Sequence, residues 1–431
     1  MMARLTIAVG VLAVLVSASP AATIRVDVNG QGDYTTIQEG IDASASGDTV
    51  LILPGTYTGE QNRSLNFGGR LISLIGEAGR EATTIDCQSA GRAFVFDTGE
   101  TWDALVQGIT VRNGSGTNGG GVWASGSSPR FFRCTFENCS GEFGGVFYLG
   151  HQSRTMIEEC EFSGNYAVDY GGCIYTYAAS PYIMYCNFTG NTAGVSGGAI
   201  SCKTWTIARI TNNTFTGNYA HDGGCIYVGT SFENFEEASP TLIQFNWFAD
   251  NSAVRGGALF LHSFSWVSCS WSTFMRNSAE EGGAVYCRTE AAGDFTLQNC
   301  TLVYNSAETG GGICSSGSSS YSEFLVTQCI IAFSTTGSSL QRIDYSPVTA
   351  DLSLAYGNQG GDEMFGSRVL YDDPLFCDIY SEDLNLCENS PCRSVNNEWN
   401  FLMGSFRAVC DKECTSPVSE TSWGAIKAMY R

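Results

Sequence analysis

Apolar and polar positions recur at a nearly fixed interval through the middle of this 431-residue chain. An apolar residue is followed three places later by an asparagine, as in Phe188 and Asn191, and a Gly-Gly pair comes next. The pairs begin at Gly144, Gly171, Gly197, Gly223, Gly256, Gly282 and Gly310, which gives repeat lengths of 27, 26, 26, 33, 26 and 28 residues. A unit of this length buries its apolar face only against its neighbours, so the pattern predicts a solenoid.

The apolar runs within each repeat predict strands and not helices. Runs such as 182–185 and 258–261 are short and bounded by Gly, Asn, Ser or Pro, whereas a helical repeat needs longer segments of 3.6-residue periodicity. The leucine and asparagine spacing of leucine-rich repeats is missing. We therefore predict an all-β fold: a right-handed parallel β-helix solenoid with a short N-terminal cap helix and a cysteine-containing C-terminal cap.

Stacking at the strand spacing of about 4.8 Å places equivalent residues of successive turns in ladders. We expect a buried phenylalanine ladder and an asparagine ladder whose side chains hydrogen-bond to one another. A third column consists of Cys134, Cys160, Cys186, Asn213, Asn246, Ser272, Cys300 and Cys329. Stacked cysteines are close enough for disulfides, but their parallel Cβ vectors favour unbonded thiols that fill the core.

The chain divides into four segments. Residues 1–22 show the charged, apolar and small-residue zones of a secretory signal peptide, and residues 23–104 form the N-terminal cap and first coils. Repeats occupy 105–370, and 371–431 form a Cys-rich C-terminal cap or tail. Export places the 18 cysteines in an oxidising compartment. We expect a monomer without a transmembrane segment in the mature chain.

Three short motifs near the N-terminus point to a known superfamily. They are Tyr-Thr-Thr-Ile-Gln at 34–38, Gly-Asp-Thr-Val at 47–50 and Pro-Gly-Thr-Tyr at 54–57. This opening resembles the N-terminal cap of the pectin-lyase-like superfamily and, in this segment, pectin methylesterases. The resemblance implies the β-helix fold and carries no catalytic residue.

The repeats themselves have a second resemblance. Phe-Thr-Gly-Asn at 188–191 and 215–218, with Gly-Gly-Ala-Ile at 197–200, is similar to the repeats of chlamydial polymorphic membrane proteins. Those proteins are surface-exposed autotransporter adhesins of the bacterial outer membrane. The resemblance implies a bacterial, surface-located protein, although too little chain follows residue 340 for the membrane barrel of that family.

Acidic residues outnumber basic ones by 43 to 22, which gives a formal net charge of −21. This charge disfavours nucleic acid and anionic membranes as partners, and we expect a polysaccharide or cell-surface glycan instead. CxxC pairs and clusters of Cys and His are missing, so no transition-metal cofactor is expected. Calcium is the one candidate ion, with Asp169, Glu280 and Glu308 near the turns as its ligands.

The residues just before the Gly-Gly pairs form a charged ladder. Asp222, Arg255 and Glu281 fall on successive turns, and His221 and Glu280 precede two of them. These residue types suit the binding of an acidic sugar, the binding of calcium or acid–base catalysis. A solvated salt-bridge ladder that separates like charges is the plainer explanation.

The 33-residue repeat carries an insertion at 230–239. It contains Phe232, Phe235 and Glu236, and loops on a rigid solenoid often carry binding residues. A tolerated surface insertion is the alternative.

Together, these patterns favour a secreted or cell-surface β-helix protein without catalytic activity that binds glycan or another surface. One alternative is a polysaccharide-active lyase, hydrolase or esterase of the pectin-lyase-like superfamily, with Asp222, Arg255 and Glu281 as the catalytic candidates. Another is a purely structural spacer.

Overall fold

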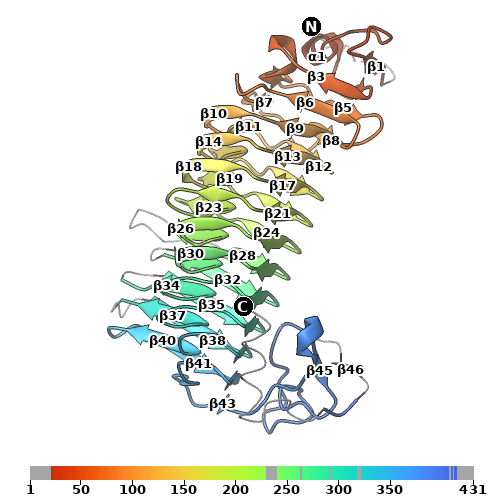
Figure 1. Cartoon of the computed structure of the whole chain (residues 1–431). Coiled ribbons are helices and arrows are strands. Elements are labelled where there is room, and N and C mark those ends of the chain that lie inside the picture. The colour runs from red at the N-terminus through yellow and green to blue at the C-terminus, as the bar shows by residue number, and fades with distance from the viewer. Residues whose placement is uncertain are drawn as a thin grey trace, which may run out of the picture.

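The computed structural model describes residues 21–229, 240–262, 265–290, 293–317, 322–406, 409–410 and 412–414. The described residues up to 370 form a parallel β-solenoid that runs as one stack from the N-terminal cap, at the top of Figure 1, to the last turns. The turns visit up to four sheets in a constant order, which we call sheets I, II, III and IV, and six of the turns have a strand in sheet III. The predicted right-handed parallel β-helix is confirmed.

Sheets I and II each contain thirteen strands. Sheet I consists of β1 (Thr23–Val26), β2 (Thr49–Ile52), β5 (Ser73–Gly76), β8 (Leu105–Gln107), β12 (Arg130–Phe132), β16 (Met156–Glu158), β20 (Tyr182–Met184), β24 (Arg209–Thr211), β28 (Thr241–Gln244), β32 (Trp266–Ser270), β35 (Gly293–Gln298), β38 (Ser322–Thr327) and β41 (Val348–Asp351). Sheet II consists of β3 (Gly55–Tyr57), β6 (Thr83–Asp86), β9 (Thr110–Arg112), β13 (Thr135–Glu137), β17 (Glu161–Ser163), β21 (Asn187–Thr189), β25 (Thr214–Thr216), β29 (Trp247–Ala249), β33 (Thr273–Met275), β36 (Thr301–Val303), β39 (Ile330–Ala332), β42 (Ser353–Tyr356) and β43 (Val369–Leu370).

Sheets III and IV contain six and eleven strands. Sheet III consists of β10 (Ser115–Asn118), β14 (Ser140–Phe143), β18 (Tyr166–Tyr170), β22 (Thr192–Ala193), β26 (Tyr219–Asp222) and β30 (Ser252–Arg255). Sheet IV consists of β4 (Leu65–Asn66), β7 (Phe94–Phe96), β11 (Val122–Ser125), β15 (Phe147–Gly150), β19 (Ile174–Tyr177), β23 (Ile200–Lys203), β27 (Ile226–Gly229), β31 (Leu259–Leu261), β34 (Val285–Arg288), β37 (Ile313–Ser316) and β40 (Leu340–Ile343).

The predicted phenylalanine ladder runs through the core inside sheet II. Its members are Phe136, Phe162, Phe188, Phe215, Phe248 and Phe274, with neighbouring ring centroids 5.2, 4.6, 4.8, 4.9 and 4.7 Å apart. The rings are nearly parallel and almost completely removed from solvent. Because the strand spacing equals a ring-stacking distance, the register itself aligns these rings.

The predicted asparagine ladder lies at the turn between sheets II and III. Asn191 donates from its side-chain amide to Phe162 O at 3.1 Å and to the side-chain oxygen of Asn218 at 3.0 Å. The same pattern links Asn165, Asn191, Asn218, Asn251, Asn277 and Asn305. Every buried polar atom of these amides is thereby satisfied, which a buried asparagine requires.

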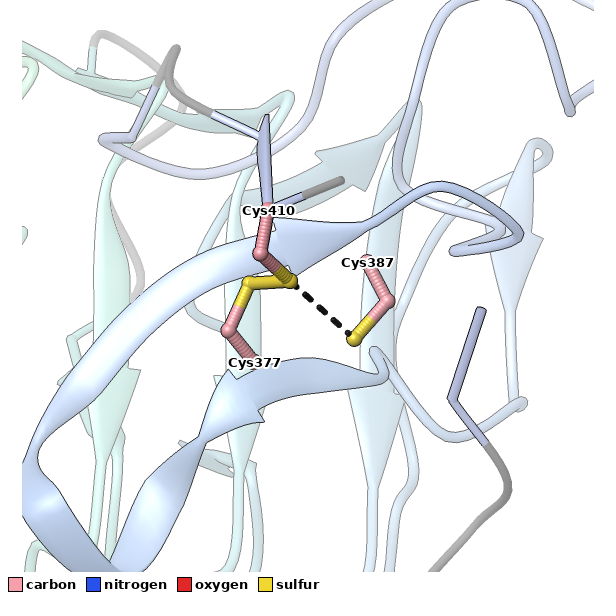
Figure 2. A group of neighbouring side chains, drawn as sticks. All are labelled: Cys377, Cys387 and Cys410. Atoms are coloured by element: carbon pink, nitrogen blue, oxygen red, sulfur yellow. Dashed lines mark hydrogen bonds between the residues drawn. A yellow bond between two sulfur atoms is a disulfide. The ribbon is translucent and has the colours of Figure 1, made fainter. Parts of the chain in front are cut away.

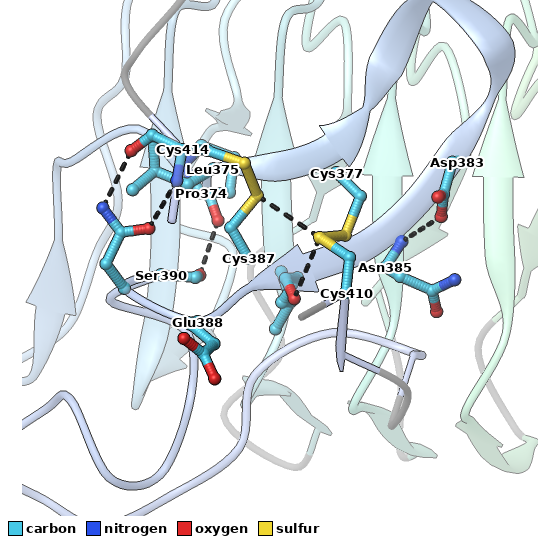
Figure 3. The surroundings of a disulfide bond; sticks show 12 residues. Pro374, Leu375, Cys377, Asp383, Asn385, Cys387, Glu388, Ser390, Cys410 and Cys414 are labelled. Carbon is cyan, nitrogen blue, oxygen red and sulfur yellow. Dashed lines mark hydrogen bonds between the residues drawn. A yellow bond between two sulfur atoms is a disulfide. The ribbon is translucent and has the colours of Figure 1, made fainter. Parts of the chain in front are cut away.

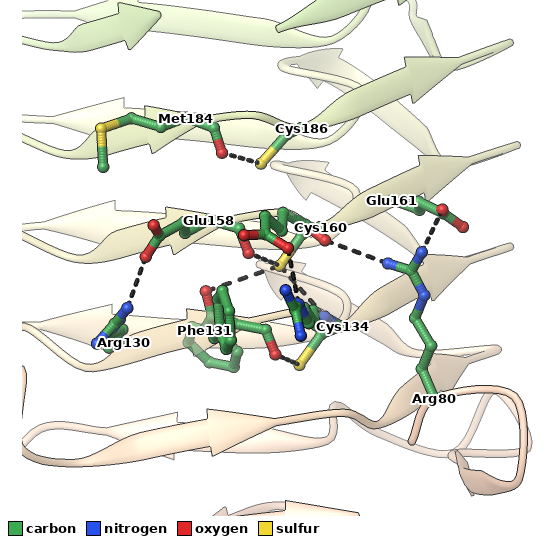
Figure 4. A network of polar contacts seen from close by, with 12 residues as sticks. Arg80, Arg130, Phe131, Cys134, Glu158, Cys160, Glu161, Met184 and Cys186 are labelled. Atoms are coloured by element: carbon green, nitrogen blue, oxygen red, sulfur yellow. Dashed lines mark hydrogen bonds and ion pairs between the residues drawn. The ribbon is translucent and has the colours of Figure 1, made fainter. Parts of the chain in front are cut away.

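The third column contains free thiols, as predicted. Figure 4 shows Cys134, Cys160 and Cys186 on three successive turns, and their sulfur atoms contact carbonyl oxygens two residues earlier in the chain. All cysteines from Cys87 to Cys329, and Cys392, are unbonded and buried. The thiols therefore serve as small core residues.

The N-terminal end of the solenoid is covered by helix α1 (Ile37–Ala43), next to the short 3-10 helix η1 (Glu60–Asn62) (Figure 1). Ile37 and Ile41 are fully buried, as their shared helical face predicts. The Asn62 side chain accepts a hydrogen bond of 2.8 Å from the Ile37 backbone and so joins α1 to η1. The predicted cap helix is confirmed.

The C-terminal segment forms a small sheet of β44 (Phe376–Asp378), β45 (Asp383–Cys387) and β46 (Val409–Cys410), with the 3-10 helix η2 (Ile379–Ser381). Two disulfides, Cys377–Cys410 and Cys387–Cys414, hold it together (Figure 3). Figure 2 shows Cys387 beside the Cys377–Cys410 bond, and the sulfurs of Cys387 and Cys410 lie 3.6 Å apart.

This segment packs against the outer face of sheet II. Ser405 hydrogen-bonds to Thr273 at 2.8 Å, and Asn299 donates to Leu402 O at 2.8 Å. The outward residues of sheet II at these turns include Met275 and Val303, which are buried. The predicted cysteine-containing C-terminal segment is thus present, and it lies against the flank of the solenoid, where it covers apolar outward residues.

Candidate functional site

The charged ladder predicted from the sequence exists in the structure. Asp222 is the register partner of Arg255, and Arg255 pairs with Glu281 on the next turn. The Arg255 guanidinium donates two hydrogen bonds to the Asp222 carboxylate, at 2.9 and 2.8 Å, and His221 Nδ1 lies 2.9 Å from the same carboxylate. Within the part of the chain that the structure describes, Arg255 makes no ion pair with Glu281. The ladder is thus centred on Asp222.

Lys203 joins this cluster and was not singled out by the sequence. Its ammonium lies 3.6 Å from the Tyr227 ring centroid and 4.4 Å from that of Tyr170. Burial lowers the pKa of the Lys203 amine to about 8, an effect that the Asp222 carboxylate opposes. The two rings and the carboxylate stabilise the cation, so the cluster is largely satisfied internally.

Other predicted site residues do not converge. Asp169 and Glu280 are four turns apart in the same column, which at about 4.8 Å per turn is near 19 Å, so they cannot share an ion. Glu280 and Glu308 lie on adjacent turns and are exposed, and calcium binding there stays a prediction. Phe232, Phe235 and Glu236 lie outside the described residues.

Across the described ranges, one group of three side chains has metal-ligand spacing: Cys377, Cys387 and Cys410. These sulfurs belong to the two disulfides of the C-terminal segment. They stabilise that segment covalently and are not available as thiolate ligands.

A second candidate site lies along the turn between sheets I and II. We call its residues Arg133, Glu159, Tyr185, Asn212, Phe245 and Trp271 the aromatic edge; each occupies the same turn position, one turn after another. The side chains of Tyr185 and Phe245 are 56% and 50% exposed, and the Phe245 and Trp271 rings stack with centroids 6.4 Å apart. We therefore treat these rings as a candidate contact surface.

The backbone of the aromatic edge is left-handed. Tyr185, Phe245 and Trp271 have φ values of 56°, 56° and 52°. Glycine and asparagine adopt this conformation cheaply, and Gly108 and Asn212 do so in the same column, whereas a bulky residue costs of order 1 kcal/mol or more. Two of these strained positions, Tyr185 and Phe245, thus carry large exposed rings.

A groove of about 560 Å³ opens beside Tyr185 at the N-terminal end of this edge. Arg80 spans it: the guanidinium donates to Glu159 O at 3.1 Å and forms an ion pair with Glu161, shown in Figure 4. Arg133 pairs with the Glu159 carboxylate at 2.7 Å. The groove therefore combines an exposed ring with carboxylates and guanidiniums fixed by one another.

The position of the aromatic edge can be read from the sequence, next to the cysteine column. Each edge residue directly precedes a member of the cysteine column, as Tyr185 precedes Cys186. The column mixes basic, acidic, amide and aromatic residues, so it shows no repetition. The structure shows that the whole column is a left-handed turn and that Tyr185 and Phe245 are its exposed aromatic members.

Comparison with known proteins agrees with the fold. Residues 92–236 match the family model described as "Right handed beta helix region". Pectinesterase 2 from Citrus sinensis is 28% identical over 162 residues, which are 35% of this chain and 30% of that protein. The chain is thus a right-handed parallel β-helix protein with sequence similarity to a pectinesterase over about a third of its length.

Three solved structures resemble the whole chain more loosely. A pectin methylesterase from carrot has a TM-score of 0.34 at 13% identity and covers 78% of this chain and 89% of its own. The pectate lyase Pel9A has a TM-score of 0.42 at 11% identity, with 93% and 94% covered. An alginate lyase of family PL6 has a TM-score of 0.47 at 12% identity, with 92% and 60% covered. The likeness to chlamydial polymorphic membrane proteins stays a prediction.

None of the helices in the described ranges has the length and apolar character that a membrane span requires.

Proposed function

We propose that this chain is an exported, monomeric β-helix protein that binds an extended polysaccharide along the aromatic edge without cleaving it. The observation that carries the proposal is the pair of exposed rings held at left-handed backbone positions, Tyr185 and Phe245, with the Trp271 ring stacked on Phe245. Folding does not require a ring at these positions, because Arg133, Glu159 and Asn212 adopt the same turn conformation. Two exposed rings are hard to account for in a purely structural spacer.

The dimensions of the edge suit a linear polymer. Tyr185 and Phe245 are two turns apart, about 10 Å, and Trp271 follows one turn later. Aromatic rings supply rigid contact area for the apolar faces of sugar rings at a small cost in side-chain entropy. A polymer that follows the solenoid axis would meet these rings one after another and enter the groove beside Tyr185.

The absence of turnover is part of the proposal. In the groove, the Glu161 and Glu159 carboxylates are bound by Arg80 and Arg133. A catalytic acid or base must exchange a proton with the substrate, and a carboxylate held by a guanidinium is poorly placed to do so. The Asp222 carboxylate is likewise held by Arg255.

A polysaccharide-active enzyme is the second candidate. The sequence similarity to a citrus pectinesterase favours it, as does a groove that holds carboxylates next to an exposed tyrosine. Under this alternative, the edge would bind the polymer and the groove would hold the reacting unit. The two candidates share the binding surface and differ in turnover.

The test is a binding and turnover panel on wild type and matched variants. Tyr185→Asn and Phe245→Asn should each weaken polysaccharide binding at least tenfold, because asparagine accepts the left-handed backbone but removes the ring. Tyr219→Asn is the control, since Tyr219 is 46% exposed on sheet III, away from the edge. Equal losses in all three variants, or no binding by wild type, would refute the proposal.

Turnover is measured on the same polymers as new reducing ends, unsaturated products and released methanol. We expect none with wild type. Product formation that Glu161→Gln abolishes, with folding intact, would establish the enzyme instead.

A further inference from the structure

The charges of the groove beside Tyr185 define the class of polymer that it accepts. Its lining carries the carboxylates of Glu77, Glu81, Glu159 and Glu161 and the guanidiniums of Arg80 and Arg133, a net charge of −2. Arg25 from β1 pairs with Glu77 at 3.0 Å, and even with this residue included a carboxylate remains in excess. The groove is therefore acidic on a chain that is itself strongly acidic.

The two arginines of the groove are already engaged. Arg80 contacts Glu161, the Glu159 carbonyl and, at 3.5 Å, Glu81. Arg133 contacts Glu159, and its guanidinium lies 4.8 Å from the Phe132 ring. An incoming carboxylate would have to displace one of these partners and leave it uncompensated.

Arginines on the strands next to the edge are engaged as well. Arg276 lies at the opposite turn of sheet II, directly after β33, and is held by Asp250 at 2.7 Å and also by Glu382. Arg209 stacks on Tyr182 at the start of its strand, away from the turn. Within the described residues that form the edge and its groove, each arginine is thus bound to a carboxylate.

We infer that the aromatic edge takes a polysaccharide whose units carry no carboxylate and rejects polyuronates. A polyuronate carries one negative charge per unit and would meet an acidic groove, where like charges cost free energy over about one Debye length, near 8 Å at physiological salt. An uncharged polymer loses nothing there and gains the ring contacts. The inference rests on the proposed function and adds the charge of the ligand to it.

The experiment compares two polymers with the same sugar backbone: oligogalacturonate and its methyl ester, in which each carboxylate is replaced by an uncharged ester. EDTA is present so that no divalent cation bridges carboxylates. An uncharged β-glucan oligomer of similar length is the third probe. We expect the ester and the glucan to bind at least tenfold more tightly than the acid, and their binding to be independent of salt. Glu81→Arg should reduce the ratio of the affinities for the ester and the acid at least threefold, because Glu81 is 85% exposed and its replacement reverses one charge of the groove.

The outcomes separate the two proposals. If none of the three polymers binds wild type, the proposed function itself fails. If the acid binds as tightly as its ester, the edge binds polysaccharide but the inference about charge is wrong. If the preference is present and Glu81→Arg leaves it unchanged while Tyr185→Asn abolishes binding, the groove does not set the preference and the inference also fails.

Discussion

The buried thiols should make this protein unusually sensitive to alkali. In twelve of them, burial raises the pKa above its ordinary value, to about 12 for Cys139 and Cys202. The thiol pKa in the folded state exceeds the unfolded value, which is near 8.5. The unfolded chain therefore ionises first, so the free energy of unfolding is unaffected below about pH 8 and falls as the pH rises. At pH 9 each such thiol lowers the free energy of unfolding by about 0.8 kcal/mol, and twelve together lower it by about 10 kcal/mol. That sum is comparable to the whole stability of a typical domain.

The assay is urea denaturation at pH 7 and pH 9, followed by far-UV circular dichroism in oxygen-free buffer with EDTA. The control is the double variant Cys160→Ala and Cys225→Ala, which removes two of the buried thiols. Between pH 7 and pH 9 its free energy of unfolding should fall by about 1.7 kcal/mol less than that of wild type. The packing cost of the substitutions cancels, because it is the same at both pH values. A wild-type loss below about 2 kcal/mol, or an unchanged loss in the variant, would refute the reasoning.

Four further predictions concern stability. Phe188→Ala should cost about 5 kcal/mol in urea denaturation because it empties a site stacked on both faces, whereas Tyr185→Asn should change stability by less than about 1 kcal/mol. Arg255→Ala should cost about 1 to 2 kcal/mol, since it leaves the Asp222 carboxylate without its main donor; no change in the melting temperature would contradict this. A thiol reductant should destabilise the C-terminal segment by about 2 to 4 kcal/mol per disulfide. Under native conditions a thiol reagent should then react only with the cysteines of this segment, and early reaction of the ladder thiols would contradict the prediction. Millimolar calcium should raise the melting temperature modestly if Glu280 and Glu308 bind it, and Glu280→Gln should remove the shift.

The fold was predictable because the same residue types recur in the core at every turn. Phe188 predicts the positions of Phe162 and Phe215, and Asn191 does so for Asn165 and Asn218, so three columns fix the register. The pairing of Asp222 with Arg255 followed from that register alone. In a solenoid, the register of the core residues thus predicts which surface residues lie next to one another on successive turns.

The aromatic edge and the position of the C-terminal segment were not predictable in the same way. The edge needs the backbone conformation of Tyr185, which no spacing reveals. The C-terminal segment covers the outward side chains of Met275 and Val303. Alternation along their strands predicts that these side chains point outward but not that they are buried. Only a contact from more than one hundred residues away, such as that between Asn299 and Leu402, shows that this outward face is buried.

The left-handed turn explains how a binding surface can arise on a fold so constrained in its core. At this position the side chain leaves the solenoid, while Cys186, one residue later, enters the core and is fully buried. The ladders on either side, with their stacked rings and satisfied amides, hold the turn in its conformation whichever residue occupies it. The strain of a tyrosine or phenylalanine there is therefore tolerated without loss of the fold, and folding alone favours glycine or asparagine. Folding therefore does not explain the exposed rings of Tyr185 and Phe245, and under the proposed function they contact a polymer that lies along the solenoid axis.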